Sequence, residues 1–500
     1  MKKIVCFRGR DTIDHTTDMS KSERRGWWDS MVRGSVASVT TLLAGLILLL
    51  LPATGARAAS FTVTDLKDGV GANYFCTNPR YKDDFCTLRL AISASNANGQ
   101  SNTISLPAGD YHLNSALPPI TSAMMIKGEG ADLVRIYGRK DFGNRFRVFE
   151  VVKGGTLELH NVTIREGHAD GSSHLGQGGG LWNAGVLRVH RSIIEANNSN
   201  TQGGGIYNSG RLELYTTTVR NNNDNDNLNN QTRGGGLYNV RGDNRGSVWI
   251  EDSTISGNKA GFGAGIANYG EINIVNSTIS GNETTGEQVD PLDPDWVNAG
   301  GILNFGVARL KSVTITGNLA TGGRSCFGEC LRLGHTWAGG VYNYDGDFYF
   351  ANTIIAGNSV VDSGIVGEDC SGVLISQRGN LVGDPGFSTN DVSNGIHGKY
   401  PCIIMDWPSL PSSGAPRDQI GRKTTIGRIL AGDIFVMDSM GFPKLQPNGG
   451  PTETHALCNT KYCIRAIDQA WTGGPFACEA HDQRGVMRVG RCDIGAYEAQ

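Results

Sequence analysis

The sequence predicts an all-β solenoid, a parallel β-helix, and two repeated patterns carry this prediction. The first pattern is a hexapeptide that begins at Gly178, Gly203, Gly234, Gly263, Ala299 and Ala338 and reads GGGLWN, GGGIYN, GGGLYN, GAGIAN, AGGILN and AGGVYN. The second pattern is a Gly followed by a short alternating strand, a few residues further on in each copy. Such self-similarity marks a repeat protein, and a shortest repeat of about 24 residues is typical of a β-helix coil rather than of a helical repeat or a propeller blade.

The alternating segments are the strands expected to form the coil walls. They read GTLELH, GVLRVH, GRLELY, GSVWIE, GEINIV, GVARLK and GDFYFA, starting at Gly155, Gly185, Gly210, Gly246, Gly270, Gly306 and Gly346. Because side chains alternate between the two faces of a strand, we expect the apolar ones to fill the core and the others to face outward. On the outer face, Glu158, Arg188 and Glu213 alternate in sign and are expected to pair across neighbouring coils.

Two sets of asparagines recur at equivalent places and are expected to stack into columns. The first set closes the hexapeptides and comprises Asn183, Asn208, Asn239, Asn268, Asn304 and Asn343. The second set follows a turn glycine and comprises Asn258, Asn282, Asn318 and Asn358. An inward asparagine can bond to the next coil, and each buried polar group left unsatisfied would cost about 1–3 kcal/mol. We therefore predict that these asparagines help to hold the coils in register.

The two ends of the repeat region differ from it and are expected to cover the solenoid. Residues 59–150 are predicted to form an N-terminal cap and the first coils, with a short amphipathic helix at Leu88 to Ala97. Residues 151–387 form the repeats, and residues 388–500 a disulfide-bearing C-terminal cap. In that cap, Asp482, Arg484, Asp493 and Glu498 are expected to make structural ion pairs with one another or to bond to the backbone.

Residues 1–58 carry the pattern of an export signal. Val36 to Pro52 is apolar, basic residues precede it, and Ala56-Arg57-Ala58 predicts cleavage before Ala59. Translation could begin at Met1 or at Met31, and an uncleaved anchor is the alternative interpretation. No second apolar run follows, so we expect no membrane span in the mature chain. The expected destination is the medium or the cell surface, with the periplasm as an alternative.

The cysteines also fit an exported protein. One of the eleven, Cys6, precedes the predicted cleavage site, and the other ten fall into near neighbours. Proximity suggests the pairs Cys76/Cys86, Cys326/Cys330, Cys370/Cys402, Cys458/Cys463 and Cys478/Cys492. Spacing alone does not determine disulfide connectivity. A zinc site at Cys326 and Cys330 with His335 is the alternative, and it is weaker because no second pair at zinc spacing is present.

Several strings outside the repeats resemble known families. CTLRLAISASNA (Cys86 to Ala97) and ISLPAGDYHL (Ile104 to Leu113) resemble the CSLREA domain, although Thr87 and Leu90 depart from its motif. GNLVGDPGF, NGGPTETHAL, AIDQA, DQRGVMR and CDIGAYE, in this order from Gly379 to Glu498, resemble the choice-of-anchor Q domain family. This resemblance implies an exported, right-handed parallel β-helix of the pectin-lyase-like type. The family supplies no catalytic residues that could be carried over.

Composition excludes one class of partner. Lys and Arg number 45 against 48 Asp and Glu, so the net charge is −3, and no basic cluster with interleaved aromatic residues is present. These features argue against nucleic-acid binding. No cofactor is expected, with the exception of Ca²⁺, for which carboxylates such as Asp224 and Asp226 are suitable ligands.

The candidate binding site lies where the repeats vary in length. From the turn asparagine to the next hexapeptide the interval changes from copy to copy, so the longer loops are expected to project from one edge. The loop at residues 283–298 holds Asp290, Asp293, Asp295 and Trp296, a combination suited to sugar binding. The loop at residues 319–337 holds the Cys326/Cys330 pair and ends near His335 and Trp337. A polysaccharide or a surface protein is the expected partner.

An enzyme is the alternative prediction, either a polysaccharide lyase or a glycoside hydrolase acting on an acidic polysaccharide. A hydrolase needs two carboxyl groups about 5–10 Å apart. The wall acids Glu158, Glu213, Glu251 and Asp252 fall mostly on different coils, and no close pair recurs. His160 and His190 occupy equivalent positions and are expected to stack on the outer wall. Binding without catalysis is therefore the preferred interpretation, and the catalytic residues are unassigned.

Overall fold

The computed structural model divides the chain into two units, Met1–Gly55 and Ala56–Gln500. It describes residues 58–69, 76, 85–138, 145–171, 173–223, 232–240, 246–284, 298–321, 325–327, 329–331, 336–361, 369–385, 402–406, 417–421, 429–458, 466–472 and 476–499, all in the second unit. The predicted signal segment lies outside these residues, so the export signal stays a prediction. Within the described segments, no helix is long and apolar enough to cross a membrane.

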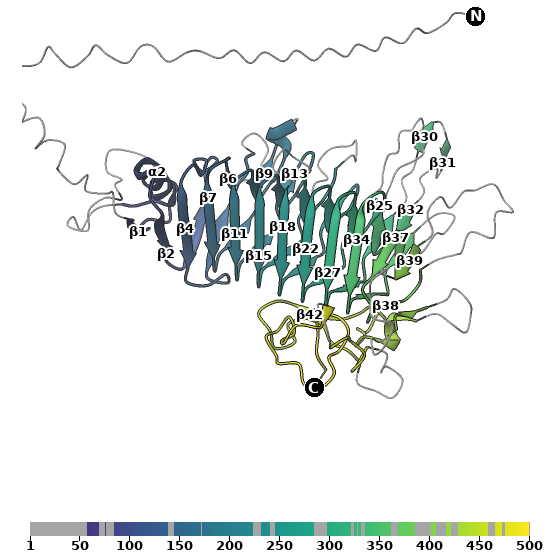
Figure 1. Cartoon of the computed structure of the whole chain (residues 1–500). Helices are drawn as coiled ribbons and strands as arrows, with labels where there is room; N and C mark the ends of the chain where they lie inside the picture. The colour runs from purple at the N-terminus through teal and green to yellow at the C-terminus, as the bar shows by residue number, and fades with distance from the viewer. Residues whose placement is uncertain are drawn as a thin grey trace, which may run out of the picture. The chain divides into compact units, whose positions relative to one another are not determined.

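The second unit contains the predicted right-handed parallel β-helix (Figure 1). Each full coil contributes one strand to each of three columns. The hexapeptide column comprises β6 (Phe149–Val151), β10 (Leu181–Asn183), β14 (Ile206–Asn208), β17 (Leu237–Asn239), β21 (Ile266–Asn268), β26 (Ile302–Asn304) and β33 (Val341–Asn343). All of its pairings are parallel and in register from one coil to the next.

The long-strand column carries the alternating segments and faces the viewer in Figure 1. It comprises β1 (Ser60–Thr62), β2 (Asn102–Leu106), β4 (Ala123–Gly128), β7 (Thr156–His160), β11 (Val186–His190), β15 (Arg211–Tyr215), β18 (Ser247–Glu251), β22 (Glu271–Val275), β27 (Val307–Lys311), β34 (Asp347–Ala351), β37 (Cys370–Ser376) and β39 (Cys402–Asp406). The predicted alternation is confirmed. Leu187 and Val189 are fully buried, for example, whereas Arg188 between them faces outward.

The third column is a separate sheet, which we call the flank sheet. It comprises β3 (Gly109–His112), β5 (Val134–Tyr137), β8 (Thr163–Arg165), β12 (Ile193–Glu195), β16 (Thr218–Arg220), β19 (Thr254–Ser256), β23 (Thr278–Ser280), β28 (Thr314–Thr316), β35 (Ile354–Ile355), β38 (Leu381–Val382) and β40 (Gln419–Ile420). Its inward residues, such as Ile255, Ile279 and Ile315, complete one continuous apolar core that runs along the coils. This core is the main source of stability expected for a solenoid.

Both predicted asparagine columns are present and buried. In the first column, each side-chain amide from Asn183 to Asn304 donates to the Oδ1 of the next asparagine over 2.7–2.9 Å. In the second column, the amides from Asn258 to Asn318 donate in the same way over 2.9 Å. The structure extends this second column beyond the prediction, to Asn197 and Asn222 at one end and to Asp369 at the other. The prediction missed Asn197 and Asn222 because no glycine precedes them.

The N-terminal helix is confirmed as α2 (Leu88–Asn98). The Thr87 hydroxyl accepts a hydrogen bond from the Leu90 N–H at its start, and Gly99 ends it with a φ of 64°. A left-handed residue at this point is usual for glycine, which lacks a Cβ. Ala91 and Ile92 of α2 are fully buried in the solenoid core, so the helix covers the first coils as predicted.

The described C-terminal residues, 429–458, 466–472 and 476–499, form an irregular lobe that lies against the flank sheet (Figure 1). We call these residues the C-terminal lobe. Regular structure in its described part comprises η2 (Ala431–Asp433) and the antiparallel pair β41 (Leu445–Gln446) and β42 (Thr454–His455). The sequence predicted a cover over the end of the stack. The lobe instead covers the side of the middle and later coils, because the outer face of the flank sheet carries small hydroxyl and apolar side chains there.

Three of the predicted disulfides are confirmed: Cys76–Cys86, Cys370–Cys402 and Cys478–Cys492. The first lies next to α2, the second joins β37 to β39, and the third closes a loop of the lobe. Cys458 is also disulfide-bonded, and its predicted partner Cys463 lies outside the described residues. Cys326 and Cys330 face each other as backbone neighbours in the hairpin of β30 (Ser325–Phe327) and β31 (Glu329–Leu331). Their bond stays a prediction.

Candidate functional site

The predicted binding residues lie in loops of which the structure describes only the ends. Asp224, Asp226, Asp290, Asp293, Asp295, Trp296 and His335 fall outside the described residues. The backbone of Trp337 belongs to β32 (Thr336–Ala338), and its side chain is outside the description. These assignments therefore stay predictions.

The ends of the two longest loops, however, lie side by side. Glu283 of β24 (Glu283–Thr284) pairs with Leu319 of β29 (Leu319–Thr321), one coil further on. Asn298 of β25 (Asn298–Ala299) pairs with Thr336 of β32. The loops at residues 285–297 and 322–335 thus leave the same edge of the solenoid from neighbouring coils. This is the arrangement that the varying repeat intervals predicted.

A column of aromatic rings runs along this side of the coils, which the sequence analysis did not single out. The stack comprises Trp182, Tyr207, Tyr238, Tyr269, Phe305 and Tyr344, with successive ring centroids 6.0, 5.5, 5.3, 4.6 and 5.0 Å apart. The signal was in the sequence, because the ring stands just before the hexapeptide asparagine in the first three copies and just after it in the last three. Stacked rings hold neighbouring coils together by offset contact.

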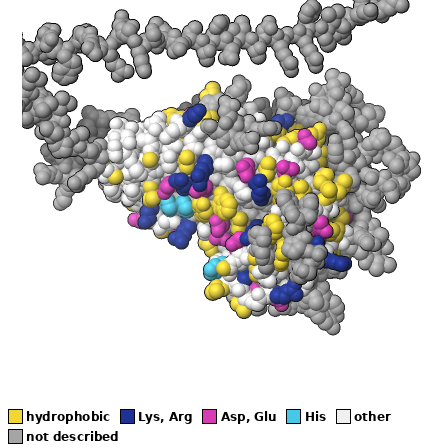
Figure 2. All heavy atoms as spheres, viewed as in Figure 1, with side chains coloured by type: hydrophobic (Ala, Val, Ile, Leu, Met, Phe, Trp, Pro, Cys, Tyr) yellow, Lys and Arg dark blue, Asp and Glu magenta, His cyan; other side chains and the backbone are white. Residues whose placement is uncertain are grey.

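The outer face of the long-strand column carries a chain of ion pairs. Arg188 bonds Glu158 over 2.9 Å and Glu213 over 3.0 Å, as the alternation of sign predicted. Figure 2 shows basic and acidic side chains gathered beside histidines on the viewed face. Because both carboxylates are held by the same guanidinium, they are poorly placed to act as an acid and a base on a substrate.

The two wall histidines are stacked, as predicted. The rings of His160 and His190 lie 4.4 Å apart with an angle of 6° between their planes, and Tyr215 continues the stack at 4.9 Å. Burial lowers the pKa of both imidazoles below the ordinary 6.5, more than Glu158 raises it, and His160 lowers the pKa of His190 further. Both rings are therefore largely neutral at pH 7. Their faces are turned to each other, so they offer little surface on which a sugar ring could stack.

The contacts between the C-terminal lobe and the flank sheet are specific. Three threonines at equivalent positions of successive coils bond to it: Thr254 donates to the Glu453 carbonyl, Thr278 to the Gln483 side chain, and Thr314 accepts from the Ala496 N–H. Further along, Ile354 and Leu381 pack into a second apolar cluster with lobe residues that include Phe435 and Leu457. The lobe is thus fixed across several coils.

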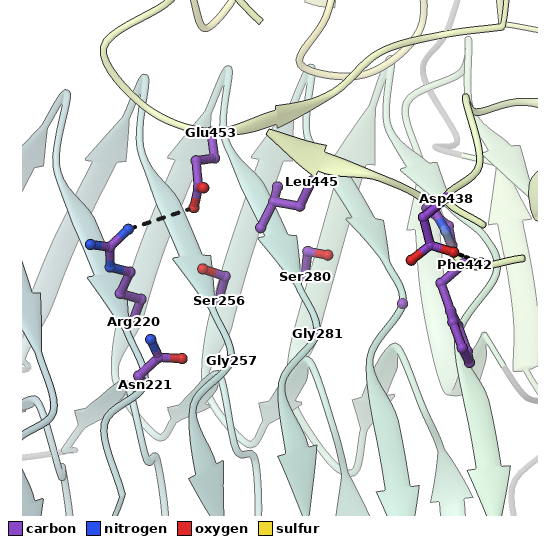
Figure 3. A pocket seen from close by; sticks show the side chains of 12 residues that line it. Arg220, Asn221, Ser256, Gly257, Ser280, Gly281, Asp438, Phe442, Leu445 and Glu453 are labelled. Carbon is purple, nitrogen blue, oxygen red and sulfur yellow. Dashed lines mark hydrogen bonds and ion pairs between the residues drawn. The ribbon is translucent and has the colours of Figure 1, made fainter. Parts of the chain in front are cut away.

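A groove of about 520 Å³ remains between the flank sheet and the lobe (Figure 3). Its floor is formed by four successive coils, through Arg220, Ser256, Ser280 and Gly317. The lobe supplies the opposite wall, through Asp438, Phe442, Pro443, Leu445 and Glu453. The volume lies within the range of about 300–1,000 Å³ that is usual for small-ligand sites. The sequence analysis missed this site because its two walls are about two hundred residues apart along the chain.

Two arrangements at the groove could suggest catalysis, and neither fits it. Ser280 Oγ lies 2.7 Å from His455 Nε2, the spacing of a nucleophile and its base. Burial, however, lowers the pKa of His455 to about 3, so this imidazole is too weak a base to accept the serine proton near neutral pH. Glu453 and Asp438 lie toward opposite ends of the groove (Figure 3), which spans four coils spaced about 4.8 Å apart. Both carboxylates also have partners: Glu453 pairs with Arg220 over 3.9 Å, and Asp438 Oδ1 accepts hydrogen bonds from the Met440 and Phe442 N–H groups.

Among the described residues, no three His, Cys, Asp or Glu side chains are grouped so that they could hold a metal ion. Asp252 has a pKa raised to about 7, mainly by burial and then by the charge of Glu251. It lies beside the lobe, where Thr452 donates to its carbonyl oxygen. The predicted Ca²⁺ ligands Asp224 and Asp226 lie outside this part of the chain.

Comparison with known proteins adds little to the fold. No protein-family model matches the chain, and no curated protein is similar to it in sequence. The crystal structure of pectate lyase Pel9A is similar at 12% identity and a TM-score of 0.47, over 89% of this chain and 97% of that chain. The crystal structure of DFA-IIIase from Arthrobacter chlorophenolicus A6 is similar at 12% identity and a TM-score of 0.28, over 66% of this chain and 88% of that chain. Neither likeness bears on function, and the parallel β-helix rests on the strand pairing itself.

Proposed function

We propose that this chain is an exported β-helix protein that binds a glycan or a surface protein through loops on one edge of its solenoid, without catalysis. The proposal includes membership of the choice-of-anchor Q family, with a CSLREA-like N-terminal region, as the sequence motifs imply. It also includes Ca²⁺ binding by the loop that contains Asp224 and Asp226. The chain would then be a rigid scaffold that presents variable loops.

One observation carries the proposal: the ends of two long insertions are paired with each other in consecutive coils. Glu283 pairs with Leu319 and Asn298 with Thr336, so the ends of the two loops lie on neighbouring coils. This supports the proposal that Asp290, Asp293, Asp295 and Trp296 act together with His335 and Trp337. Loops held at the base by a rigid scaffold lose less conformational entropy when they bind. Acidic side chains together with tryptophan suit hydroxyl-rich ligands.

The described walls favour binding over catalysis. On the long-strand face, Glu158 and Glu213 are both paired with Arg188, and His160 and His190 are stacked and largely neutral. A lyase or hydrolase would need a base poised near the working pH or two carboxyl groups at a suitable distance. Asp252, whose pKa is raised to about 7, is the exception among the wall acids, and it lies beside the C-terminal lobe rather than on the open wall.

Export is supported by the disulfides. Three bonds have both partners among the described residues, and two of them, Cys370–Cys402 and Cys478–Cys492, join segments 32 and 14 residues apart. Disulfides persist in oxidising compartments and are rare in the cytosol. Together with the apolar N-terminal stretch and the Ala56-Arg57-Ala58 site, they favour a secreted or surface location.

The first experiment is a screen of the processed chain, from Ala59, against neutral and acidic polysaccharides, with binding and product formation recorded together. Binding without new reducing ends or unsaturated products is expected. Products would overturn the non-catalytic proposal and would require each wall carboxylate and histidine to be tested.

Deletion of one long loop tests whether the ligand binds at the loop edge of the solenoid. Glu283 and Thr284 belong to β24 and pair with β20 (Lys259–Ala260) and β29, so the deletion should be confined to residues 285–297, replaced by a short Gly-Ser linker. We expect loss of binding with a nearly unchanged unfolding midpoint. Unfolding of the coil would show that the loop is structural, and retained binding would place the ligand elsewhere. Replacement of Asp224 and Asp226 by Asn should abolish Ca²⁺ binding measured by calorimetry.

A further inference from the structure

The floor of the groove beside the C-terminal lobe is unusually bare. On the outer face of the flank sheet, equivalent positions of successive coils hold Arg165, Glu195 and Arg220, and then Ser256, Ser280 and Thr316. Large charged side chains thus give way to small hydroxyl side chains where the lobe begins. Ser256 and Ser280 are nearly buried and line the groove.

The turn glycines add to this bare floor. Gly257, Gly281 and Gly317 have φ values of 63°, 63° and 66°. The earlier coils hold Glu166, Ala196 and Asn221 in the same left-handed conformation, so the backbone does not demand glycine here. A Cβ built on Gly281 would meet no atom closer than 3.9 Å, and one on Gly317 none closer than 3.6 Å. Gly281 and Gly317 therefore leave open space within the groove, whereas a Cβ on Gly257 would lie 2.5 Å from Asn221 Oδ1.

The lobe presents a fixed aromatic ring to this space. Phe442 lines the groove with 59% of its surface exposed. Asp438 Oδ1 accepts hydrogen bonds of 2.9 Å from the N–H groups of Met440 and Phe442, which hold the turn that carries the ring. An exposed aromatic ring at the wall of a groove offers an apolar face against which a sugar ring can pack.

The polar groups of the groove are suited to hydroxyl groups. Arg220 and Glu453 form a 3.9 Å ion pair at one end, and each side chain is about a third exposed. Asp438 lies toward the other end in Figure 3. Arg220 is also bonded over 2.9 Å to Glu195, so acidic groups outnumber the guanidinium around the groove. This balance disfavours an acidic sugar, whereas carboxylates and serines can exchange hydrogen bonds with neutral hydroxyls.

From these features we infer that the groove between the flank sheet and the C-terminal lobe binds a short neutral oligosaccharide. The apolar face of a sugar ring would stack on Phe442, and its hydroxyls would bond to Glu453, Asp438 and the two serines. The site is on a different wall from the edge loops, so it does not depend on the proposed function being correct there.

Calorimetry on the processed chain tests this site, with cellohexaose, xylohexaose, mannohexaose and laminarihexaose as probes and hexagalacturonate as the acidic comparison. At least one neutral probe should bind and hexagalacturonate should bind more weakly. Phe442→Ala should weaken binding at least tenfold. Gly281→Asn should abolish binding because the new side chain would occupy the floor of the groove. Little backbone strain is expected, since Asn221 adopts the same left-handed conformation at the equivalent position two coils earlier.

The matched control is Met440→Ala, two residues from Phe442 in the same turn, 77% exposed and outside the groove lining. It should bind within twofold of the parent chain. The inference is overturned if no neutral probe binds at millimolar concentration, if hexagalacturonate binds best, or if both Phe442→Ala and Gly281→Asn bind like the parent. Deletion of residues 285–297 separates the two proposals: groove binding should survive it, and loss of binding only in that deletion would place the ligand on the edge loops.

Discussion

The solenoid and the C-terminal lobe stabilise their polar groups in different ways. In the solenoid, buried amides such as Asn239 and Asn258 bond to the same residue type one coil away, and every coil repeats the arrangement. In the lobe, each buried charge has its own partner: Arg484 pairs with Asp482 over 2.6 Å, as predicted, and Glu498 pairs over 3.1 Å with Arg488, which was not predicted. Asp493 accepts backbone hydrogen bonds from the Asp468 and Ala499 N–H groups, the predicted alternative to an ion pair. In a repeating structure, the side-chain amide of one coil finds its hydrogen-bond partner at the same position of the next coil. The irregular lobe has no such repeat, and its buried polar groups are held by ion pairs and by a disulfide. The two regions should therefore respond differently to mutation, reduction and acid.

The largest expected difference concerns the ion pairs. Arg484 and Asp482 have side-chain exposures of 6% and 0%, and the guanidinium also lies 3.8 Å from the centre of the Tyr497 ring. Arg484→Gln leaves a buried carboxylate without its partner and should destabilise the lobe by about 3–5 kcal/mol. Arg188→Gln on the open wall should cost the solenoid only about 0.5–1 kcal/mol. Denaturant unfolding followed by hydrogen exchange of each region measures both, and equal losses would contradict the comparison.

Loss of the Cys478–Cys492 bond should act on the lobe alone. The bond joins residues 14 apart, and closure of such a loop is worth about 3 kcal/mol in the chain-entropy account. The double variant Cys478→Ser/Cys492→Ser should make the lobe sensitive to limited proteolysis while the coils resist it. The control is Cys370→Ser/Cys402→Ser, which removes the bond between β37 and β39 and should leave the proteolysis of the lobe unchanged.

Two asparagine substitutions compare the stacked asparagine column of the solenoid with a single hydrogen bond in the lobe. Asn239 is fully buried and donates to Asn268 Oδ1 over 2.8 Å, so Asn239→Ala should lower the free energy of unfolding of the solenoid by about 1–3 kcal/mol. Asn448 of the lobe donates to the Thr454 carbonyl over 2.9 Å and is half-buried, so Asn448→Ala should cost less and only locally. An unchanged melting midpoint for Asn239→Ala would mean that the ladder does not stabilise the coils.

Acid should loosen the lobe before the solenoid. Burial lowers the pKa of His455 from 6.5 to about 3, so its neutral form contributes stability above pH 6.5 that is lost as the pH falls toward 3. At pH 5.5, one unit below the ordinary value, the loss should be on the order of 1 kcal/mol. Asp493, whose pKa burial raises to about 6, opposes this trend, because its contribution is lost as the pH rises through that value.

Hydrogen exchange between pH 7 and 5 should thus show loss of protection around β41 and β42, with the asparagine ladders unaffected. His455→Leu should remove the loss of protection on acidification, at the cost of the bond to Ser280, and leave only the opposite dependence expected from Asp493. Simultaneous loss of protection in the coils would show that the lobe and the solenoid unfold as one cooperative unit.

Much of the solenoid was predictable because its determinants are local and repeated. The spacing of Gly and Asn, the period-2 strands and the sign alternation of Glu158, Arg188 and Glu213 each predicted a contact that the structure confirms. The second asparagine ladder was predicted only in part, because Asn197 and Asn222 lack the preceding glycine that marks the later copies. The helix was predicted at Leu88 to Ala97 from its amphipathic pattern, and in the structure it ends one residue later, at Asn98. Thr87 caps its start and Gly99 its end.

The sequence by itself determined the coil, since each residue of a solenoid contacts its equivalent in the next repeat and the pattern can be read along the chain. Only the tertiary structure decided where the C-terminal lobe lies. Its contacts join residues such as Thr254 and Glu453, 199 positions apart, and no repeat predicts which face it will cover. The groove beside Phe442 exists only because these two distant segments meet. Irregular packing depends on the shape of both surfaces at once, which no local pattern along one chain encodes.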